Sequence, residues 1–123
     1  MTVLLVLAGG AVGAALRYLT SLALPPREEG EFPWATFAVN VAGSLLLGAT
    51  SGAVAATDGP GWVTTLVGTG FCGALTTFST FGYETVRLLE DGRLGTAALN
   101  VTASLVAGML AFLGAWELAA ALV

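Results

Sequence analysis

The chain alternates between four long apolar runs and three short polar joints. The runs cover about residues 2–24, 34–57, 62–89 and 94–122. A hydrocarbon core about 30 Å thick needs roughly 20 residues of helix at about 1.5 Å rise per residue, so each run is long enough to cross a membrane. We therefore expect an all-α integral membrane protein, with residues 1–123 forming one membrane domain of four spanning helices.

The joints have the composition of turns. The first, PPREEGEFP, holds three prolines, a glycine and four charges, and the other two contain DGPG and EDGR. Proline and glycine in such clusters end helices and favour turns. Because each joint is short, consecutive helices should be antiparallel neighbours. Trp34, Trp62 and Trp116 lie near the ends of runs, where amphipathic rings favour the headgroup level.

Composition limits the classes of function that the chain can have. Hydrophobic residues make up 56% of it and charged residues 10%; it has no histidine, one cysteine and a net charge of −4. A single cysteine, Cys72, excludes an intrachain disulfide. Thiol or Ser/His catalysis and nucleic-acid binding lack their side chains, so we do not expect an enzyme. The N-terminal segment lacks the basic n-region of a signal peptide, and its apolar run is too long for a typical h-region, so we expect it to be retained.

Two runs carry polar residues spaced by four, which places them on one face of a helix. These are Thr36, Asn40 and Ser44 in the second run and Thr96, Asn100 and Ser104 in the fourth, with Gly108 next in line. Such residues often bond across helix interfaces. Two matching ladders, each with a central asparagine, instead favour a solvated or ion-lined path.

Two GxxxG pairs, Gly9 with Gly13 and Gly48 with Gly52, allow helix backbones to approach closely. We interpret them as packing seams. Four helices are few for enclosing a pore, so we expect the chain to form an oligomer.

The third run is unusual for a membrane helix, because glycines precede a cluster of hydroxyl side chains. Glycine and back-bonding hydroxyls weaken the regular helical ladder, so we predict a break near Gly73–Thr77. Irregular backbone at membrane depth occurs where it is buried in protein or lines a cavity, and its free carbonyls commonly coordinate a cation. Phe78 and Phe81 follow on one side, as packing groups or as ring edges that could meet an anion.

The few charged residues near the runs have two interpretations each. Arg17 could extend to the interface or lie in a vestibule that attracts anions. Glu84 and Arg87, three residues apart, could form a local ion pair, or Glu84 could belong to an ion pathway.

The third run, with GFCGALTTFSTFGYE, resembles the Fluc or CrcB family of fluoride channels, and GGAVGAALRY at residues 9–18 and FAVNVAGSLLLG at residues 37–48 support the resemblance. Order, spacing and the four-run frame agree over essentially the whole chain. The resemblance implies a fluoride-selective channel in the cell membrane that exports the anion passively and confers fluoride resistance. It also implies a homodimer whose two subunits have opposite orientations in the bilayer.

The resemblance also implies roles for individual residues. The positions that match the fluoride pathway are Phe78, Phe81, Asn40, Ser79, Thr80, Ser104 and Glu84, and Arg17 matches an arginine near the vestibule. Gly73 and Thr76 match positions whose backbone carbonyls hold a structural sodium ion (Na+) at the dimer axis. Many relatives have a tyrosine near Asn100 and a serine near Gly108. Asn100 could still donate to an anion through its amide.

The arginines are unevenly distributed. Arg17, Arg27, Arg87 and Arg93 all lie toward the first and third joints, which the positive-inside rule places in the cytoplasm. This bias opposes equal insertion in both orientations, and a heterodimer with an oppositely oriented paralogue therefore stays open. Two other functions also remain: a small proton-coupled multidrug exporter, for which Glu84 is the only candidate carboxylate, and a membrane assembly subunit that transports nothing.

Overall fold

The third apolar run differs most from a regular membrane helix, and the other elements pack around it. In the computed structural model, which describes residues 1–25 and 30–123, the helices are α1 (Thr2–Ala23), α2 (Trp34–Thr57), α3 (Gly61–Val63), the π-helix η1 (Thr64–Cys72), α4 (Gly73–Leu75), α5 (Phe78–Glu90) and α6 (Leu94–Leu122). The described residues form no strand. The all-α prediction is confirmed.

Three of these helices are long and apolar enough to cross a membrane. They are α1, α2 and α6, with 22, 24 and 29 residues, and they coincide with the first, second and fourth apolar runs to within a residue at each end. The third run is divided into α3, η1, α4 and α5, none of which is long enough alone. The predicted broken helix is therefore confirmed.

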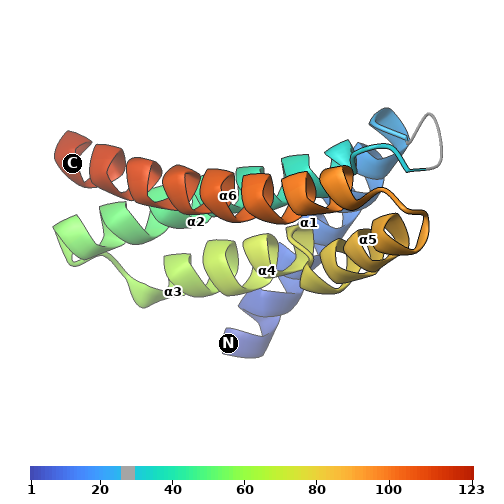
Figure 1. Cartoon of the computed structure of the whole chain (residues 1–123). Coiled ribbons are helices and arrows are strands. Elements are labelled where there is room, and N and C mark those ends of the chain that lie inside the picture. Colours follow the sequence, from blue (N-terminus) through green and yellow to red (C-terminus); the bar gives the residue numbers. More distant parts are fainter. Residues whose placement is uncertain (26–29) are drawn as a thin grey trace.

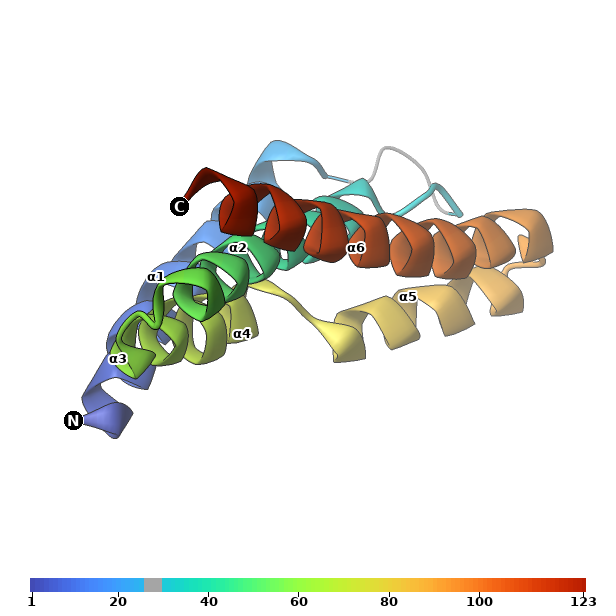
Figure 2. The same ribbon diagram turned by 90° about the vertical axis from the view of Figure 1, so that its left-hand side faces the viewer.

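The break lies between α4 and α5. Thr76 and Thr77 have extended backbone angles, with φ −78° and ψ 158° at Thr76 and φ −149° and ψ 121° at Thr77. The linker between α4 and α5 is visible in Figure 2. The break thus occupies the last two positions of the predicted Gly73–Thr77 segment. The wide π-helical turns of η1 before it were not predicted.

α2 and α6 form a long parallel pair, in which both helices start at the end with the first and third joints (Figure 1). Their close approach depends on the second GxxxG pair: a Cβ on Gly48 would overlap the Phe112 carbonyl oxygen, and one on Gly52 would lie 2.5 Å from the Trp116 carbonyl oxygen. Glycine is therefore required at both positions.

α1 packs against η1 and α4 by the same means. A Cβ on Gly9 would overlap the Leu66 carbonyl oxygen, and one on Gly13 would overlap that of Phe71. Both GxxxG pairs thus contact helices of the same chain. Their interpretation as packing seams is confirmed, and they give no support to an oligomer.

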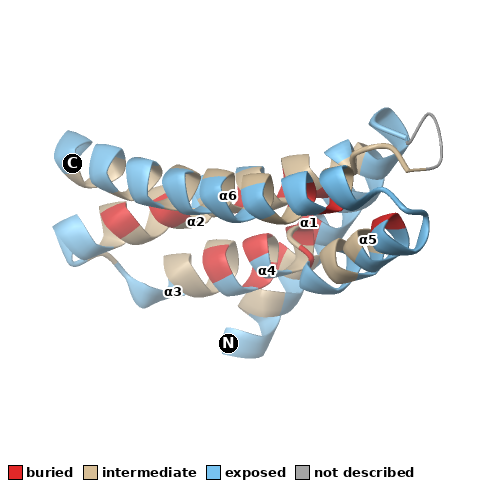
Figure 3. Cartoon of the chain, in the orientation of Figure 1, coloured by how far each residue is buried: buried red, intermediate tan, exposed pale blue. Residues whose placement is uncertain are grey.

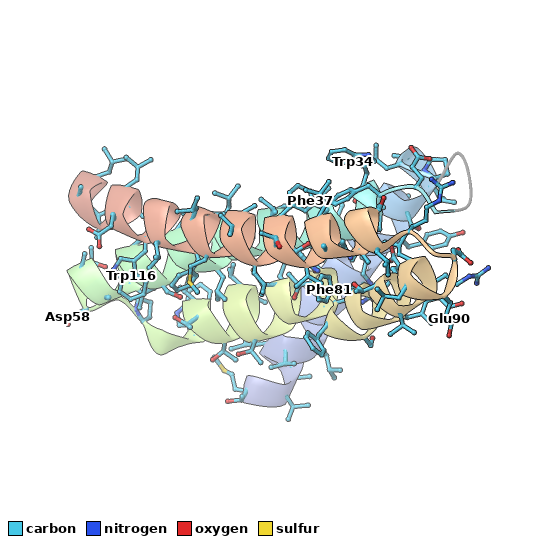
Figure 4. All side chains as sticks on the ribbon, in the orientation of Figure 1. Trp34, Phe37, Asp58, Phe81, Glu90 and Trp116 are labelled. Carbon is cyan, nitrogen blue, oxygen red and sulfur yellow. The ribbon has the colours of Figure 1, made fainter. Side chains whose placement is uncertain are left out.

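The first and third joints lie at the same end of the molecule (Figure 1). Gly30, in the first joint, lies against the Arg93 side chain, which would be 2.8 Å from a Cβ at that glycine. In Figure 4, Trp34 and Glu90 lie toward this end, and Trp116 and Asp58 lie at the other. Arg27, which contributed to the predicted charge bias, lies outside the described residues.

Most of the outer surface is exposed and apolar. Figure 3 shows the outward side of α6 exposed along its length, while the buried residues face neighbouring helices. The buried apolar side chains are few and are Val39, Cys72, Leu75, Leu88 and Ala97. Exposed apolar side chains on long apolar helices suit contact with lipid or another subunit.

Candidate functional site

The side chain of Asn40 holds the broken backbone in place. Its Nδ2 atom donates to the Thr77 carbonyl oxygen over 3.1 Å, and its Oδ1 atom accepts from the Thr77 backbone nitrogen over 2.8 Å. An amide can do both at once because it carries a donor and an acceptor. One α2 side chain thus pairs both backbone polar groups of the residue at the break, which would be costly to leave unpaired at membrane depth.

Thr77 forms the N-cap of α5. Its Oγ1 atom accepts from the Thr80 backbone nitrogen over 3.1 Å and donates to the Thr80 hydroxyl over 3.0 Å. Threonine is a favourable N-cap because its hydroxyl pairs a backbone N–H of the first turn. Ser79 lies beside it, with the two hydroxyl oxygens 3.4 Å apart. The hydroxyl cluster therefore starts α5 after the break.

Two of these hydrogen bonds, those accepted by Asn40 Oδ1 and by Thr77 Oγ1, use N–H groups that would bond to backbone carbonyls in a regular helix. In a continuous α-helix the Thr77 N–H would bond to the Gly73 carbonyl, and the Thr80 N–H to that of Thr76. Here those N–H groups bond to Asn40 Oδ1 and to Thr77 Oγ1. The Gly73 and Thr76 carbonyls thus lose their normal α-helical donors, as expected of carbonyls that could coordinate a cation.

A groove of about 370 Å³ runs beside the break, and we call it the break groove. It is lined from α2, the broken helix and α6, by residues that include Asn40, Ser44, Thr77, Phe78, Phe81, Ser104 and Gly108 as well as Gly73 and Thr76. Residues of both polar ladders therefore line the groove. Ser44 of the first ladder lies opposite Gly108 of the second, and a Cβ built on Gly108 would lie 3.5 Å from the Ser44 hydroxyl oxygen. The groove therefore brings together residues that lie far apart in the sequence.

Two aromatic rings form one wall of the break groove. The centroids of Phe78 and Phe81 are 6.1 Å apart, with an angle of 43° between the ring planes. Phe81 is half-buried, whereas Phe78 is 85% exposed within the single chain. So exposed a ring beside a polar groove leaves an apolar surface that another molecule could cover.

A second cavity, of about 790 Å³, opens toward the first and third joints, and we call it the joint-side cavity. Its lining includes Arg17, Thr36, Thr80 and Glu84. Thr77 lines both this cavity and the break groove, so it lies at the boundary between them. Ser79, by contrast, is exposed and does not occur among the described residues that line either space.

Glu84 and Arg87 each form a hydrogen bond with a third residue. The Thr36 hydroxyl donates to the Glu84 carboxylate, which links α2 to α5 across the joint-side cavity. Arg87 donates to the Tyr83 hydroxyl over 3.0 Å. The first ladder is thus divided between the two spaces: Thr36 lines the joint-side cavity, whereas Asn40 and Ser44 line the break groove.

Asn100 lies behind the wall of the break groove. Its side chain is 1% exposed. Asn100 is not one of the described residues that line the break groove or the joint-side cavity. Its Nδ2 atom donates to the Thr85 hydroxyl over 2.9 Å, and its Oδ1 atom accepts from the Ser104 hydroxyl over 3.4 Å. Within the single chain, the Asn100 amide is therefore paired with Thr85 and Ser104.

Two site residues were not singled out from the sequence. Thr77 carries a recognisable signal, a hydroxyl residue three positions before another at the start of a helix, which is typical of an N-cap. Thr85 carries none, because its role depends on the side chain of Asn100, fifteen residues away in the sequence.

Comparison with known proteins identifies the family. Residues 4–116 match the model of the CrcB-like protein family, described as Camphor Resistance (CrcB). A protein of Frankia casuarinae named fluoride-specific ion channel FluC 1 is 54% identical, covering 99% of this chain and 95% of the relative. A protein of the same name from Streptomyces avermitilis is 51% identical over 94% of each chain. One from Novosphingobium aromaticivorans, named fluoride-specific ion channel FluC, is 43% identical over 86% of each.

Proposed function

The chain belongs to the CrcB-like family, and we propose on this basis that it is a fluoride-selective ion channel and not an enzyme. The observation that carries the proposal is the break groove, in which an amide, a hydroxyl and two phenyl rings from three helices meet at a broken membrane helix. These groups suit a small anion that must lose water without meeting a full positive charge.

The groups of the break groove can replace the hydration shell of fluoride. Asn40 uses one N–H of its Nδ2 atom on Thr77, which leaves the second N–H as a donor. Phenyl rings carry a positive edge, so the edges of Phe78 and Phe81 can face an anion. Ser104 lines the groove from α6, but its one hydroxyl hydrogen is donated to Asn100 Oδ1, so it adds a polar group and not a free donor. Fluoride would thus exchange water for several weak donors and could still leave, as conduction requires.

We infer a path that connects the two spaces. The anion enters the joint-side cavity near Arg17, Thr80 and Glu84, passes Thr77 and Asn40, and continues along the rings of the break groove. Thr77 supports this order because it lines both spaces. Arg17 at the entrance would raise the local concentration of anions.

We propose that two copies of the chain are needed, inserted in opposite orientations. Phe78, with its exposed ring, and Gly73, which is also exposed, both line the break groove, where a second copy could cover them. Two carbonyls from one chain are few for a cation, so two copies would supply four. The residues fit a structural sodium ion, which Gly73 and Thr76 of each chain would hold through these carbonyls, fixing the two breaks against each other.

The membrane arrangement follows from the same proposal. The broken segment Gly61–Glu90 would form a fourth span beside α1, α2 and α6, in one domain that crosses the plasma membrane four times. An anion inside a negatively charged cell is driven outward by about 2.3 kcal/mol per 100 mV. A passive pore is therefore sufficient for fluoride export and fluoride resistance.

Efflux from liposomes tests the proposal. Purified protein is reconstituted into vesicles loaded with potassium fluoride, valinomycin is added to release the potassium, and a fluoride electrode records the efflux. We expect rapid fluoride efflux and very slow chloride efflux from matched vesicles loaded with potassium chloride. Protein-free vesicles are the control. Fluoride efflux at the rate of the control, or chloride efflux at the rate of fluoride, would overturn the proposal.

A further inference from the structure

The buried amide of Asn100 connects two walls of the break groove from behind. Ser104, one α6 turn away, lines the groove and donates to Asn100 Oδ1. On the other side, Asn100 Nδ2 donates to the Thr85 hydroxyl, which in turn donates to the Phe81 carbonyl oxygen over 2.8 Å. A continuous series of hydrogen bonds therefore runs from Ser104 through Asn100 and Thr85 to Phe81.

The donors and acceptors of this series allow only one arrangement. Thr85 has a single hydroxyl hydrogen, which it gives to Phe81, so it must accept from Asn100. Asn100 then turns its oxygen toward Ser104. The Asn100 amide is only 1% exposed, so an unpaired donor or acceptor on it would bear the full desolvation cost. The series thus fixes the backbone of α5 at Phe81 relative to α6.

We propose that Asn100 is a positioning residue for the fluoride pathway: acting through Thr85, it holds the Phe81 ring opposite Ser104 at the separation that fluoride passage needs. The expected effect of Asn100 on transport rests on the proposed function. The positioning of Phe81 by Asn100 and Thr85 does not depend on it. Asn100 itself touches no ion. Its influence reaches the groove through Thr85 and Ser104.

Transport by Thr85 variants tests the effect on the pathway. Thr85 lines neither space, and Thr85→Val removes its hydroxyl at nearly constant volume. We expect about a tenfold fall in fluoride efflux, the factor that corresponds to one buried hydrogen bond. Thr85→Ser, which keeps the hydroxyl, should restore efflux to within about twofold. Thr102→Val, on the exposed side of α6, is the matched control and should not change efflux.

A fluorine label at position 81 tests the positioning without transport. With 4-fluorophenylalanine at this site, we expect one sharp 19F resonance in the parent protein and in Thr102→Val, and a shifted or broadened one in Thr85→Val. Asn100→Leu, which removes both amide bonds, serves the same purpose if Thr85→Val does not fold.

The outcomes separate the inference from the proposed function. An unchanged resonance in the Thr85 and Asn100 variants, or loss of efflux in Thr85→Ser as large as in Thr85→Val, overturns the positioning role. Absence of fluoride efflux from the unmodified protein overturns the proposed function and also the claim that Asn100 serves it. A changed resonance in that case would leave Asn100 as a packing residue only.

Discussion

Asn40 and Phe78 both line the break groove, but they are held in very different ways. Asn40 makes two hydrogen bonds to the backbone of Thr77, whereas Phe78 is 85% exposed. Substitutions at the two positions should therefore separate transport from stability.

Phe78→Ile should slow fluoride efflux at least about tenfold and change stability little, because the ring buries little surface within one chain and isoleucine can keep an apolar contact with a second copy. Isoleucine removes the aromatic edge and keeps an apolar side chain. Electrode-detected efflux and thermal unfolding in detergent check the two parts. A variant that transports at the parent rate would move the pathway away from Phe78.

Asn40→Asp should reduce both efflux and stability. A carboxylate can accept from the Thr77 nitrogen but cannot donate to the Thr77 carbonyl, which then loses its partner at a cost of about 1 to 3 kcal/mol. The added negative charge also opposes an anion. Asn40→Asp should therefore unfold at a lower temperature than Phe78→Ile. Equal melting temperatures would show that the amide does not hold the break.

The residues of the site could be predicted from the sequence to different extents. Phe78, Phe81, Asn40 and Ser104 follow from helical spacing and family resemblance, and they do share one groove. The burial of Asn100 could not be predicted, because spacing by four gives a helix face but not the neighbour that covers it. Only the pairing of α5 with α6 determines that neighbour.

At the scale of elements, two close helix contacts depend on glycine. Gly13→Ala should destabilise the chain, because the added methyl group overlaps the Phe71 carbonyl oxygen and α1 must move away from η1. We expect a loss of about 1 to 3 kcal/mol, typical of overpacking. Gly114→Ala in α6 is the matched control, because a Cβ there meets nothing within 4 Å. The control should unfold at the same or a slightly higher temperature, since alanine favours a helix. A Gly13→Ala protein as stable as the control would contradict the close contact.

Removal of sodium tests the proposed role of the broken helix. If the Gly73 and Thr76 carbonyls hold sodium, replacing sodium by a large organic cation during purification should lower fluoride efflux and the melting temperature, and added sodium should restore both. The carbonyls cannot be removed by a side-chain substitution, so ion replacement is the direct experiment. Identical melting curves with and without sodium would exclude a stabilising ion at the break.

The elements themselves follow closely from the hydrophobic pattern. α1, α2 and α6 agree with the apolar runs because lipid imposes length and composition on any helix that crosses it. The wide turns of η1 could not be predicted, because glycines at Gly68 and Gly70 permit several backbone geometries equally well. The close packing of Gly9 and Gly13 of α1 against η1 accompanies this geometry.

At the scale of the whole molecule, the arginines bear on how two copies insert. The side chain of Arg93 lies beside Gly30 at the end formed by the first and third joints, while the middle joint has no lysine or arginine. Arg17 and Arg87 lie within helices and contribute less to orientation than charges in the joints. The remaining bias is small, so we expect both orientations to be populated.

Variants whose added arginines favour a single orientation in the membrane test this expectation. Glu90→Arg increases the existing bias, and the triple variant Ala56→Arg, Thr57→Arg, Arg93→Gln reverses it; the new arginines lie in exposed last turns of helices, where a cation is favourable. If the channel needs two oppositely inserted copies, each variant alone should show several-fold less fluoride efflux from cells, and coexpression of the two should restore it. Variants with glutamine in place of the new arginines control for the loss of the original side chains. Full efflux from either charge variant expressed alone, in amounts equal to the parent, would contradict an antiparallel pair of this chain.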